Sequence, residues 1–238
     1  MPTVALIIAP THSKETRLLS TSAVNLHSYF QRSGVRSYIL LGFGARRIPL
    51  ITMLRSLWGS RLAIFYYGHG SPKTLIGSEL INRPIKQLHL ITENMRDPMN
   101  QRIVRLLRGS IIYTVACDSA EDLGQWLVEH GVRAFVGSSK PMWITQDLDF
   151  DQDHVPDMTT ILTYGPRRLL EGVSLAQAVE DYRSQAMMMA NDYSFKHNFP
   201  ELTEIMDQNV KYYRVIGDGE WKWDDTADWQ AERLEDVR

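Results

Sequence analysis

The sequence is short of three things: cysteine, long apolar runs and net charge. A single cysteine among 238 residues excludes an internal disulfide, as in a cytosolic protein, and we expect a cytoplasmic location. No stretch approaches the roughly 18 apolar residues of a membrane span, and the apolar segment 4–9 is too short for a signal peptide. The net charge of −2 offers no basic surface for nucleic acid. We therefore expect a globular chain that binds neither membranes nor nucleic acids.

Several catalytic motifs are missing as well. There is no G-x-S-x-G sequence, which disfavours a serine hydrolase. The seven histidines are scattered and form no H-E-x-x-H pair, which disfavours a zinc enzyme. Gly42-Phe43-Gly44 begins like a dinucleotide-binding fingerprint, but Arg47 stands where the third glycine is required. We predict no metal and no cofactor.

The one cysteine stands at the end of a predicted central strand. Residues 111–115 form a short β-branched apolar run, which is typical of a strand buried on both sides. Cys117 follows it, and Ser119, Glu121 and Asp122 predict a helix start over residues 121–130. A helix N-terminus so close would lower the pKa of the thiol. The alternative is that this cysteine is a small buried hydrophobic residue.

A histidine ends a second predicted strand. Residues 61–67 are another buried run, and Gly68, His69 and Gly70 follow it. If the two strands are parallel neighbours, both residues lie at the same edge of the sheet, where open α/β folds bind ligands. The histidine precedes the cysteine by 117 − 69 = 48 residues, close to the spacing of about 50 in caspases. The flanking glycines would let the backbone turn sharply near a substrate.

These two strand ends resemble those of the caspase-like cysteine peptidases, the superfamily of caspases, gingipains, legumain and CHAT domains. The CHAT and gingipain-type pattern is the most similar, because three segments look like its equivalents. These are the strand end at 137–141, the block 170–187, whose late helix begins after a Gly-x-Ser-Leu phrase, and the strand and turn at 212–218. The resemblance implies a three-layer α/β/α caspase-like sandwich with a mostly parallel sheet. It covers residues 1–223, and an acidic tail over 224–238 falls outside it.

The resemblance implies a cysteine endopeptidase that cleaves a protein or peptide substrate. Cys117 would be the nucleophile and His69 the general acid and base. The backbone N–H groups of Gly70 and Cys117 would bind the oxyanion. Neighbouring strand ends would supply the substrate pocket from Thr11, His12, Asp118, Ser138 and Ser139.

The acidic residues predict a preference for a basic residue before the scissile bond. The segment 147–157 holds five aspartates, and it is interpreted as a solvated linker rather than a calcium site, because it lacks the glycine and glutamate of an EF-hand loop.

Among microbial relatives of this superfamily, the protein that is cleaved is often a neighbouring effector protein. The rival interpretation is a binding or regulatory protein that has this fold without turnover.

The rest of the chain alternates strands and helices. Strands are predicted at 3–9, 35–41 and 132–136, and helices at 17–32, 48–58 and 97–108. Residues 71–93 contain several turn residues and predict an excursion with a small hairpin.

Overall fold

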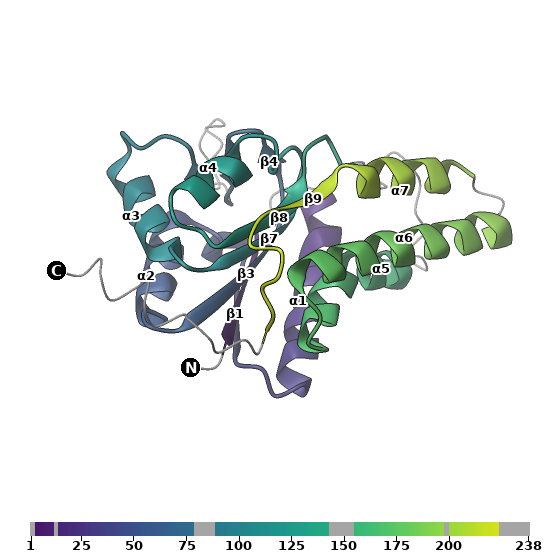
Figure 1. The fold of residues 1–238 in the computed structure, drawn as a ribbon, viewed down its shortest axis with the longest axis horizontal. Coiled ribbons are helices and arrows are strands. Elements are labelled where there is room, and N and C mark those ends of the chain that lie inside the picture. Colours follow the sequence, from purple (N-terminus) through teal and green to yellow (C-terminus); the bar gives the residue numbers. More distant parts are fainter. Residues whose placement is uncertain (1–2, 12–13, 79–88, 143–154, 198–199, 224–238) are drawn as a thin grey trace.

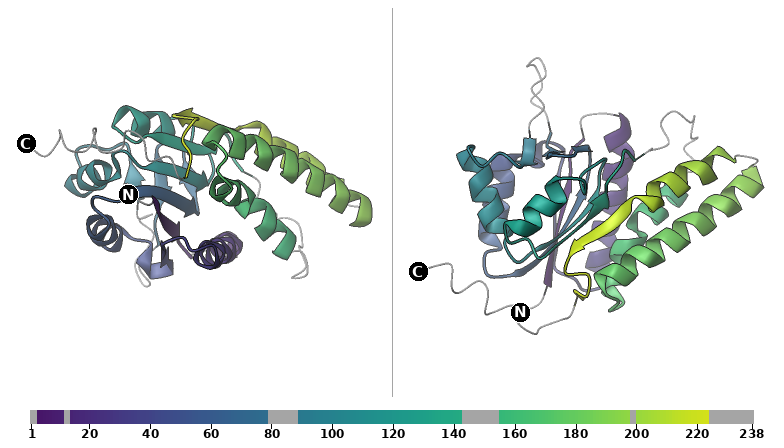
Figure 2. Two further views of the ribbon diagram at one scale, coloured as in Figure 1. Left: turned by 60° about the horizontal axis from the view of Figure 1, so that its bottom comes forward. Right: turned by 45° about the horizontal axis from the view of Figure 1, so that its top comes forward.

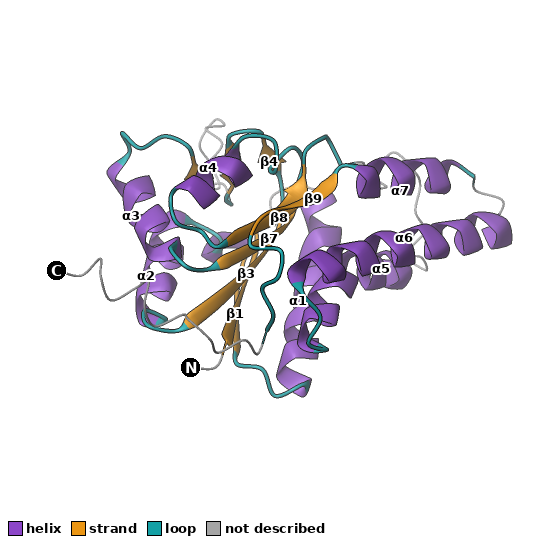
Figure 3. Cartoon of the chain, in the orientation of Figure 1, coloured by secondary structure: helices purple, strands orange, loops and turns teal. Residues whose placement is uncertain are grey.

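The computed structural model describes residues 3–11, 14–78, 89–142, 155–197 and 200–223. Within these residues a six-stranded sheet has the order β2-β1-β3-β7-β8-β9 (Figures 1 and 3). Its strands are β1 (Thr3–Ala9), β2 (Ser37–Leu41), β3 (Arg61–Tyr67), β7 (Ile111–Val115), β8 (Ala134–Ser138) and β9 (Tyr213–Gly217). All neighbouring strands are parallel except β9, which pairs antiparallel with β8.

Helices cover both faces of this sheet. They are α1 (Lys14–Arg32), α2 (Arg47–Ser56), α3 (Pro98–Leu107), α4 (Leu123–Glu129), α5 (Val155–Leu170), α6 (Leu175–His197) and α7 (Glu201–Lys211), with a short 3-10 helix η1 (Gly42–Gly44). Helices α2, α3 and α4 lie on one face, and α1, α5 and α6 lie on the other (Figure 1). This arrangement confirms the predicted three-layer α/β/α fold with a mostly parallel sheet.

The sheet separates two hydrophobic cores. Along β1, Ala5 and Ile7 point into the core shared with α1, α5 and α6, whereas Leu6 and Ile8 point into the core shared with α2, α3 and α4. Side chains of a strand alternate between the two faces, so a strand covered on both sides must be apolar throughout. The uninterrupted apolar runs of the sequence follow from this burial.

A second, smaller sheet follows β3. It consists of β4 (Gly70–Ser71), β5 (Thr74–Ile76) and β6 (His89–Thr92), which are antiparallel. The predicted excursion is therefore a three-stranded sheet, of which the expected hairpin is β4 and β5. It lies at the carboxyl ends of the parallel strands (Figure 1).

The late helices extend beyond the prediction. The helix expected after the Gly-x-Ser-Leu phrase of the block 170–187 is α6, which begins at Leu175 but continues to His197, and a separate helix, α5, precedes it. Helices α6 and α7 pack against each other and extend away from the sheet as a pair (Figure 2).

Candidate active site

Cys117 and His69 leave neighbouring parallel strands in register. Tyr67, the last residue of β3, pairs with Val115, the last residue of β7, and each candidate residue lies two positions further on. Parallel strands lie about 4.8 Å apart, so chains that leave them at the same level emerge side by side. The structure thus places both residues at one edge of the sheet, as the sequence predicts.

The turn that carries His69 packs closely on the chain at Cys117. A Cβ atom at Gly70 would lie 2.6 Å from the carbonyl oxygen of Cys117 and 3.0 Å from the Cβ of Ala116. Real Cβ atoms do not approach backbone atoms so closely, so only glycine permits this contact. The small sheet adds a second connection, because the N–H of Leu123 donates to the carbonyl of Pro72 at 2.7 Å.

The chain after Cys117 forms a turn rather than a helix start. The N–H of Asp118 donates to the Lys140 carbonyl at 3.2 Å, and the N–H of Ala120 donates to the Ser138 carbonyl at 2.9 Å. These bonds tie the turn to the end of β8, and α4 begins only at Leu123. The helix predicted over residues 121–130 is therefore present as α4, but it begins two residues later than predicted, beyond this turn.

Buried hydroxyl groups hold this turn in place. The Thr114 hydroxyl lies 2.9 Å from the Ser119 hydroxyl and donates to the Val136 carbonyl at 2.9 Å. The Ser119 hydroxyl also lies 3.3 Å from the Ala116 carbonyl. Ser119, expected to cap a helix, instead links the Cys117 turn to strand β7.

The thiol of Cys117 lies against the backbone of Met142. The N–H of Met142 donates to Sγ at 3.3 Å, and Sγ lies 3.5 Å from the Met142 carbonyl oxygen. Burial raises the pKa of the Cys117 thiol, the hydrogen bond from Met142 lowers it, and the Asp118 carboxylate raises it further, so that the pKa lies above its ordinary value. The expected lowering of this pKa by a helix N-terminus is therefore wrong in the resting structure.

The N–H of Gly70 points away from the small sheet. Gly70 belongs to β4 and pairs with Leu75, so it does have a strand partner, which the sequence analysis did not predict. The N–H of Ile76 donates to the His69 carbonyl at 3.1 Å, which makes Gly70 and Leu75 a pair without hydrogen bonds between them. The ladder with β5 therefore does not use the N–H of Gly70.

Of the predicted pocket residues, Thr11 and Asp118 are at least partly exposed at the strand ends. Thr11 is exposed beyond β1, next to Gly42, whose Cβ would lie 2.7 Å from the Thr11 hydroxyl oxygen. Asp118 is half-buried beside Cys117, and its backbone has a φ of +50°. Burial and the Glu121 carboxylate raise the pKa of Asp118, which Lys140 partly offsets.

The two serines after β8 serve the turn itself. Ser138 is fully buried, and its hydroxyl donates to the Lys140 carbonyl at 2.8 Å. Ser139 is half-buried and donates to the Tyr212 carbonyl from both its N–H, at 3.0 Å, and its hydroxyl, at 3.3 Å. A buried hydroxyl that is already bonded cannot reach a substrate, so Ser138 is better placed to support the turn.

Some sequence predictions lie outside the described residues. These are His12, the acidic segment up to residue 154 and the tail over 224–238. Within the described ranges, no group of three or more histidine, cysteine or acidic side chains is arranged to hold a metal ion. Over the same ranges, no helix is long and apolar enough to cross a membrane.

Sequence reasoning missed two residues that contact the site. Met142 supplies both backbone groups next to the thiol, and Tyr66 places its hydroxyl 2.7 Å from the His69 carbonyl. Tyr66 and Tyr67 both bring a polar tip to the end of this buried strand, and the sequence alone does not tell which hydroxyl meets the histidine turn. Met142 has no signal in the sequence, because its backbone makes the contact.

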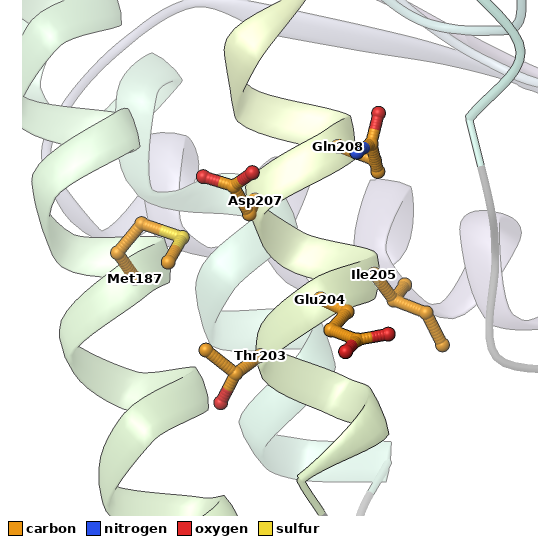
Figure 4. A pocket seen from close by; sticks show the side chains of 6 residues that line it. All are labelled: Met187, Thr203, Glu204, Ile205, Asp207 and Gln208. Atoms are coloured by element: carbon orange, nitrogen blue, oxygen red, sulfur yellow. The ribbon is translucent and has the colours of Figure 1, made fainter.

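A surface pocket lies away from the candidate active site, on helices α6 and α7. Figure 4 shows the side chains that line this pocket, with Met187 on α6 and the others on α7. The α7 residues are Thr203, Glu204, Ile205, Asp207 and Gln208. None of these residues belongs to the strand ends that carry Cys117 and His69.

No protein-family model matches this sequence. None of the curated proteins gives a significant match either. Among the solved structures with a similar chain path are two proteases. One is the X-ray structure of a secreted C11 cysteine protease from Bacteroides thetaiotaomicron in complex with an irreversible peptide inhibitor, with a TM-score of 0.44 and 10% identity. That alignment covers 59% of this chain and 49% of the other, so this chain spans about half the length of that protease.

The second solved structure is also a secreted C11 cysteine protease from Bacteroides thetaiotaomicron, called iotapain. Its TM-score is 0.42 at 10% identity, over 93% of this chain and 91% of that chain. At this level of likeness neither protease assigns an activity to this chain. The narrower resemblance to CHAT and gingipain-type domains, like the cytoplasmic location, stays a prediction.

Proposed function

We propose that this protein is a cysteine endopeptidase in which Cys117 is the nucleophile and His69 the general acid and base. One observation carries the proposal: β3 and β7 pair in register, and the two residues follow at the same distance beyond the pair of Tyr67 and Val115. A nucleophile and a proton carrier must both reach one peptide bond, and neighbouring strand ends bring them together.

The chemistry proceeds in two steps. The Cys117 sulfur attacks the carbonyl carbon of the scissile bond, and the C–N bond breaks as His69 gives a proton to the leaving amine. Water then attacks the thioester, His69 takes up one of its protons, and the acid is released with the thiol restored. The raised pKa of Cys117 means that its proton must leave before attack, and His69 is the base at this edge of the sheet.

Backbone N–H groups stabilise the negative oxygen of the tetrahedral intermediate. Those of Gly70 and Cys117 lie at the same edge of the sheet, and the glycine approaches the cysteine backbone closely. Removing one such donor in a protease costs about 10²–10³-fold in rate.

The proposed substrate pocket takes a basic side chain before the scissile bond. Asp118 follows the nucleophile directly, and its carboxylate is close enough to Glu121 and Lys140 to be affected by their charges. A half-buried carboxylate left unpaired would cost binding energy, whereas a lysine or arginine of the substrate would pair with it. Thr11, His12 and Ser139 complete the proposed pocket, and Ser138 is left out of it because it is buried.

Covalent labelling tests the proposal directly. A peptide acyloxymethyl ketone should label the full chain at Cys117, and Cys117→Ala should abolish both labelling and peptide cleavage. His69→Ala should reduce cleavage by about 10²–10⁴-fold, whereas His130→Ala, at the far end of α4, should leave it unchanged. Cleavage that survives in Cys117→Ala would refute the proposal, and a chain that neither reacts nor cleaves would favour the rival binding protein.

A fluorogenic peptide library varied at the residue before the scissile bond tests the specificity. We expect preferential cleavage after lysine and arginine, reduced in Asp118→Asn. Preferential cleavage after aspartate or small apolar residues would contradict this part alone.

A further inference from the structure

Two adjacent tyrosines end strand β3, and they point to opposite faces of the sheet. Tyr66 belongs to the core with α2, α3 and α4, and Tyr67 belongs to the core with α1, α5 and α6. Both are completely buried. The Tyr67 hydroxyl donates to the Leu162 carbonyl at 3.2 Å, far along the sequence in α5. The Tyr66 hydroxyl instead contacts the segment that directly follows β3, at the carbonyls of His69 and Ile76.

The Tyr66 hydroxyl holds the turn that carries the candidate histidine. Its oxygen lies 2.7 Å from the His69 carbonyl oxygen and 2.6 Å from the Ile76 carbonyl oxygen. The turn rests directly on the phenol, because a Cβ at Gly68 would lie 2.6 Å from the Tyr66 hydroxyl oxygen. The N–H of Ile76 donates to the same His69 carbonyl at 3.1 Å. The single phenol proton is shared between these two carbonyls, and together with the Ile76 N–H it holds the His69 carbonyl in one direction.

The His69 carbonyl and the Gly70 N–H belong to the same peptide unit. In a planar trans peptide the C=O and N–H bonds point in opposite directions. Fixing the carbonyl toward Tyr66 and β5 therefore fixes the N–H on the opposite side. Hydrogen bonds to the carbonyl also polarise the peptide and strengthen its N–H as a donor.

We infer that Tyr66 is a positioning residue, whose hydroxyl aims the Gly70 N–H at the oxyanion formed during attack by Cys117. The inference rests on the proposed peptidase function and deepens it. The phenol suits this role because burial raises the pKa of Tyr66 far above its usual value, so the hydroxyl keeps its proton at any working pH. Its ring is also locked by the core around it.

The experiment compares Tyr66→Phe with Tyr67→Phe in the full chain. Each substitution removes one buried hydroxyl that donates to a backbone carbonyl, and they stand side by side on one strand. We expect Tyr66→Phe to lower kcat for peptide cleavage by about 10–100-fold with little change in KM, somewhat less than complete loss of an oxyanion donor. Tyr67→Phe should keep the wild-type kcat when assayed below its unfolding temperature.

A second reaction separates positioning from general damage. Alkylation of Cys117 by iodoacetamide forms no oxyanion, so its rate should be the same in the wild type and both variants. A wild-type kcat in Tyr66→Phe, an equal loss in Tyr67→Phe, or an equal loss of alkylation would overturn the inference. If Cys117→Ala and His69→Ala retain cleavage, the proposed function itself fails, which is a different result.

The wild-type chain gives an independent measurement should Tyr66→Phe fail to fold. A peptide aldehyde adds to the Cys117 sulfur and forms a hemithioacetal, whose oxygen occupies the oxyanion position. We expect the amide proton of Gly70 to shift downfield and to exchange more slowly with solvent in this adduct. An amide signal that does not change would overturn the inference.

Discussion

The Asp118 carboxylate contributes to the raised pKa of the neighbouring Cys117 thiol. Burial raises the pKa of Cys117 and the Asp118 carboxylate raises it further. Because the thiolate is the reactive form, the rate of alkylation by iodoacetamide should rise with pH around a midpoint above that of free cysteine. Asp118→Asn should move this midpoint to lower pH, since it removes a negative charge that disfavours the thiolate. Asparagine also tolerates the positive φ at this position.

The matched control for this pH profile is Asp122→Asn. Asp122 is an exposed carboxylate in the same turn, and it is not among the groups that shift the thiol. Its variant should keep the wild-type midpoint. A wild-type midpoint at or below that of free cysteine would show that the resting environment of the thiol differs from the one described.

Gly70 should tolerate no side chain. In Gly70→Ala the new Cβ would meet the carbonyl oxygen of Cys117, a backbone atom that cannot turn aside. We expect a loss of about 1–3 kcal/mol in the free energy of unfolding and a fall in peptide cleavage of about 100-fold. Gly44→Ala is the control, because its nearest neighbours lie 4.0 Å away. Equal stability and activity in the two variants would mean that the close approach is absent in solution.

The candidate pair was predictable because its signals are local. An apolar strand, then Gly68-His69-Gly70 or Cys117, can be recognised without knowing any other part of the chain. The contacts of Met142 and Tyr66 were not predictable, because they depend on how distant segments pack. Tyr66 and Tyr67 are adjacent residues of the same type, so the sequence does not distinguish them. Only the fold determines which hydroxyl contacts the turn that carries His69.

Among the helix starts that the structure describes, that of α3 has the clearest signal. Asp97 caps it by accepting from the N–H of Met99 at 3.0 Å, and Pro98 occupies the first turn. Burial would raise the pKa of Asp97, but hydrogen bonds from Arg47 and the helix N–H groups lower it below its usual value. Its contribution to stability is therefore complete above the ordinary pKa of a carboxyl group and is lost as the pH falls through the lowered one.

Two substitutions separate the cap from the charge of Asp97. Asp97→Ala should lower the free energy of unfolding by about 0.5–2 kcal/mol at neutral pH. Asp97→Asn keeps a capping oxygen, so its free energy of unfolding should fall by less at neutral pH. Because asparagine does not titrate, this site should cause no further loss of stability on acidification. Urea unfolding at several pH values measures both. An alanine variant as stable as the wild type would contradict the assigned cap.

Elements with local signals were predicted well, and elements defined by distant bonds were not. The helix at 97–108 was confirmed as α3, within one residue at each end, because its cap and proline stand next to each other in the sequence. The start of α4 was misplaced because the N–H groups of Asp118 and Ala120 bond to the end of β8 instead of a helix turn. Nothing in residues 117–122 alone reveals these partners.

The last described residues, 221–223, pack against the start of the chain and against strand β3. Trp223 is buried against Phe30 and Phe65, with ring centroids 5.5 and 6.4 Å away, and its carbonyl accepts from the Thr3 hydroxyl at 2.6 Å. Arg61 adds a hydrogen bond to the Lys222 carbonyl at 2.7 Å. This segment therefore joins the two ends of the domain predicted over residues 1–223.

Trp223→Ala should lower the free energy of unfolding by about 3–5 kcal/mol, as expected for a large aromatic residue removed from a core. Urea unfolding measures this loss. Trp58→Ala is the control, and it should cost much less because Trp58 is half exposed. A chain ending after Trp223 should keep wild-type stability, and a marked loss there would place the domain boundary later than predicted.

The antiparallel partner of β8 has a consequence for synthesis on the ribosome. Strand β8 ends at Ser138, but β9, which covers its outer edge, begins only at Tyr213, and the bond from Thr3 to Trp223 spans 220 positions. Until those last residues emerge, the nascent chain exposes an unpaired strand edge beside an unfinished core, and such edges invite aggregation. Chaperones that bind nascent chains would therefore matter most after β8 has been synthesised and before β9 has. Slower translation of this interval would prolong the time in which the chain can aggregate.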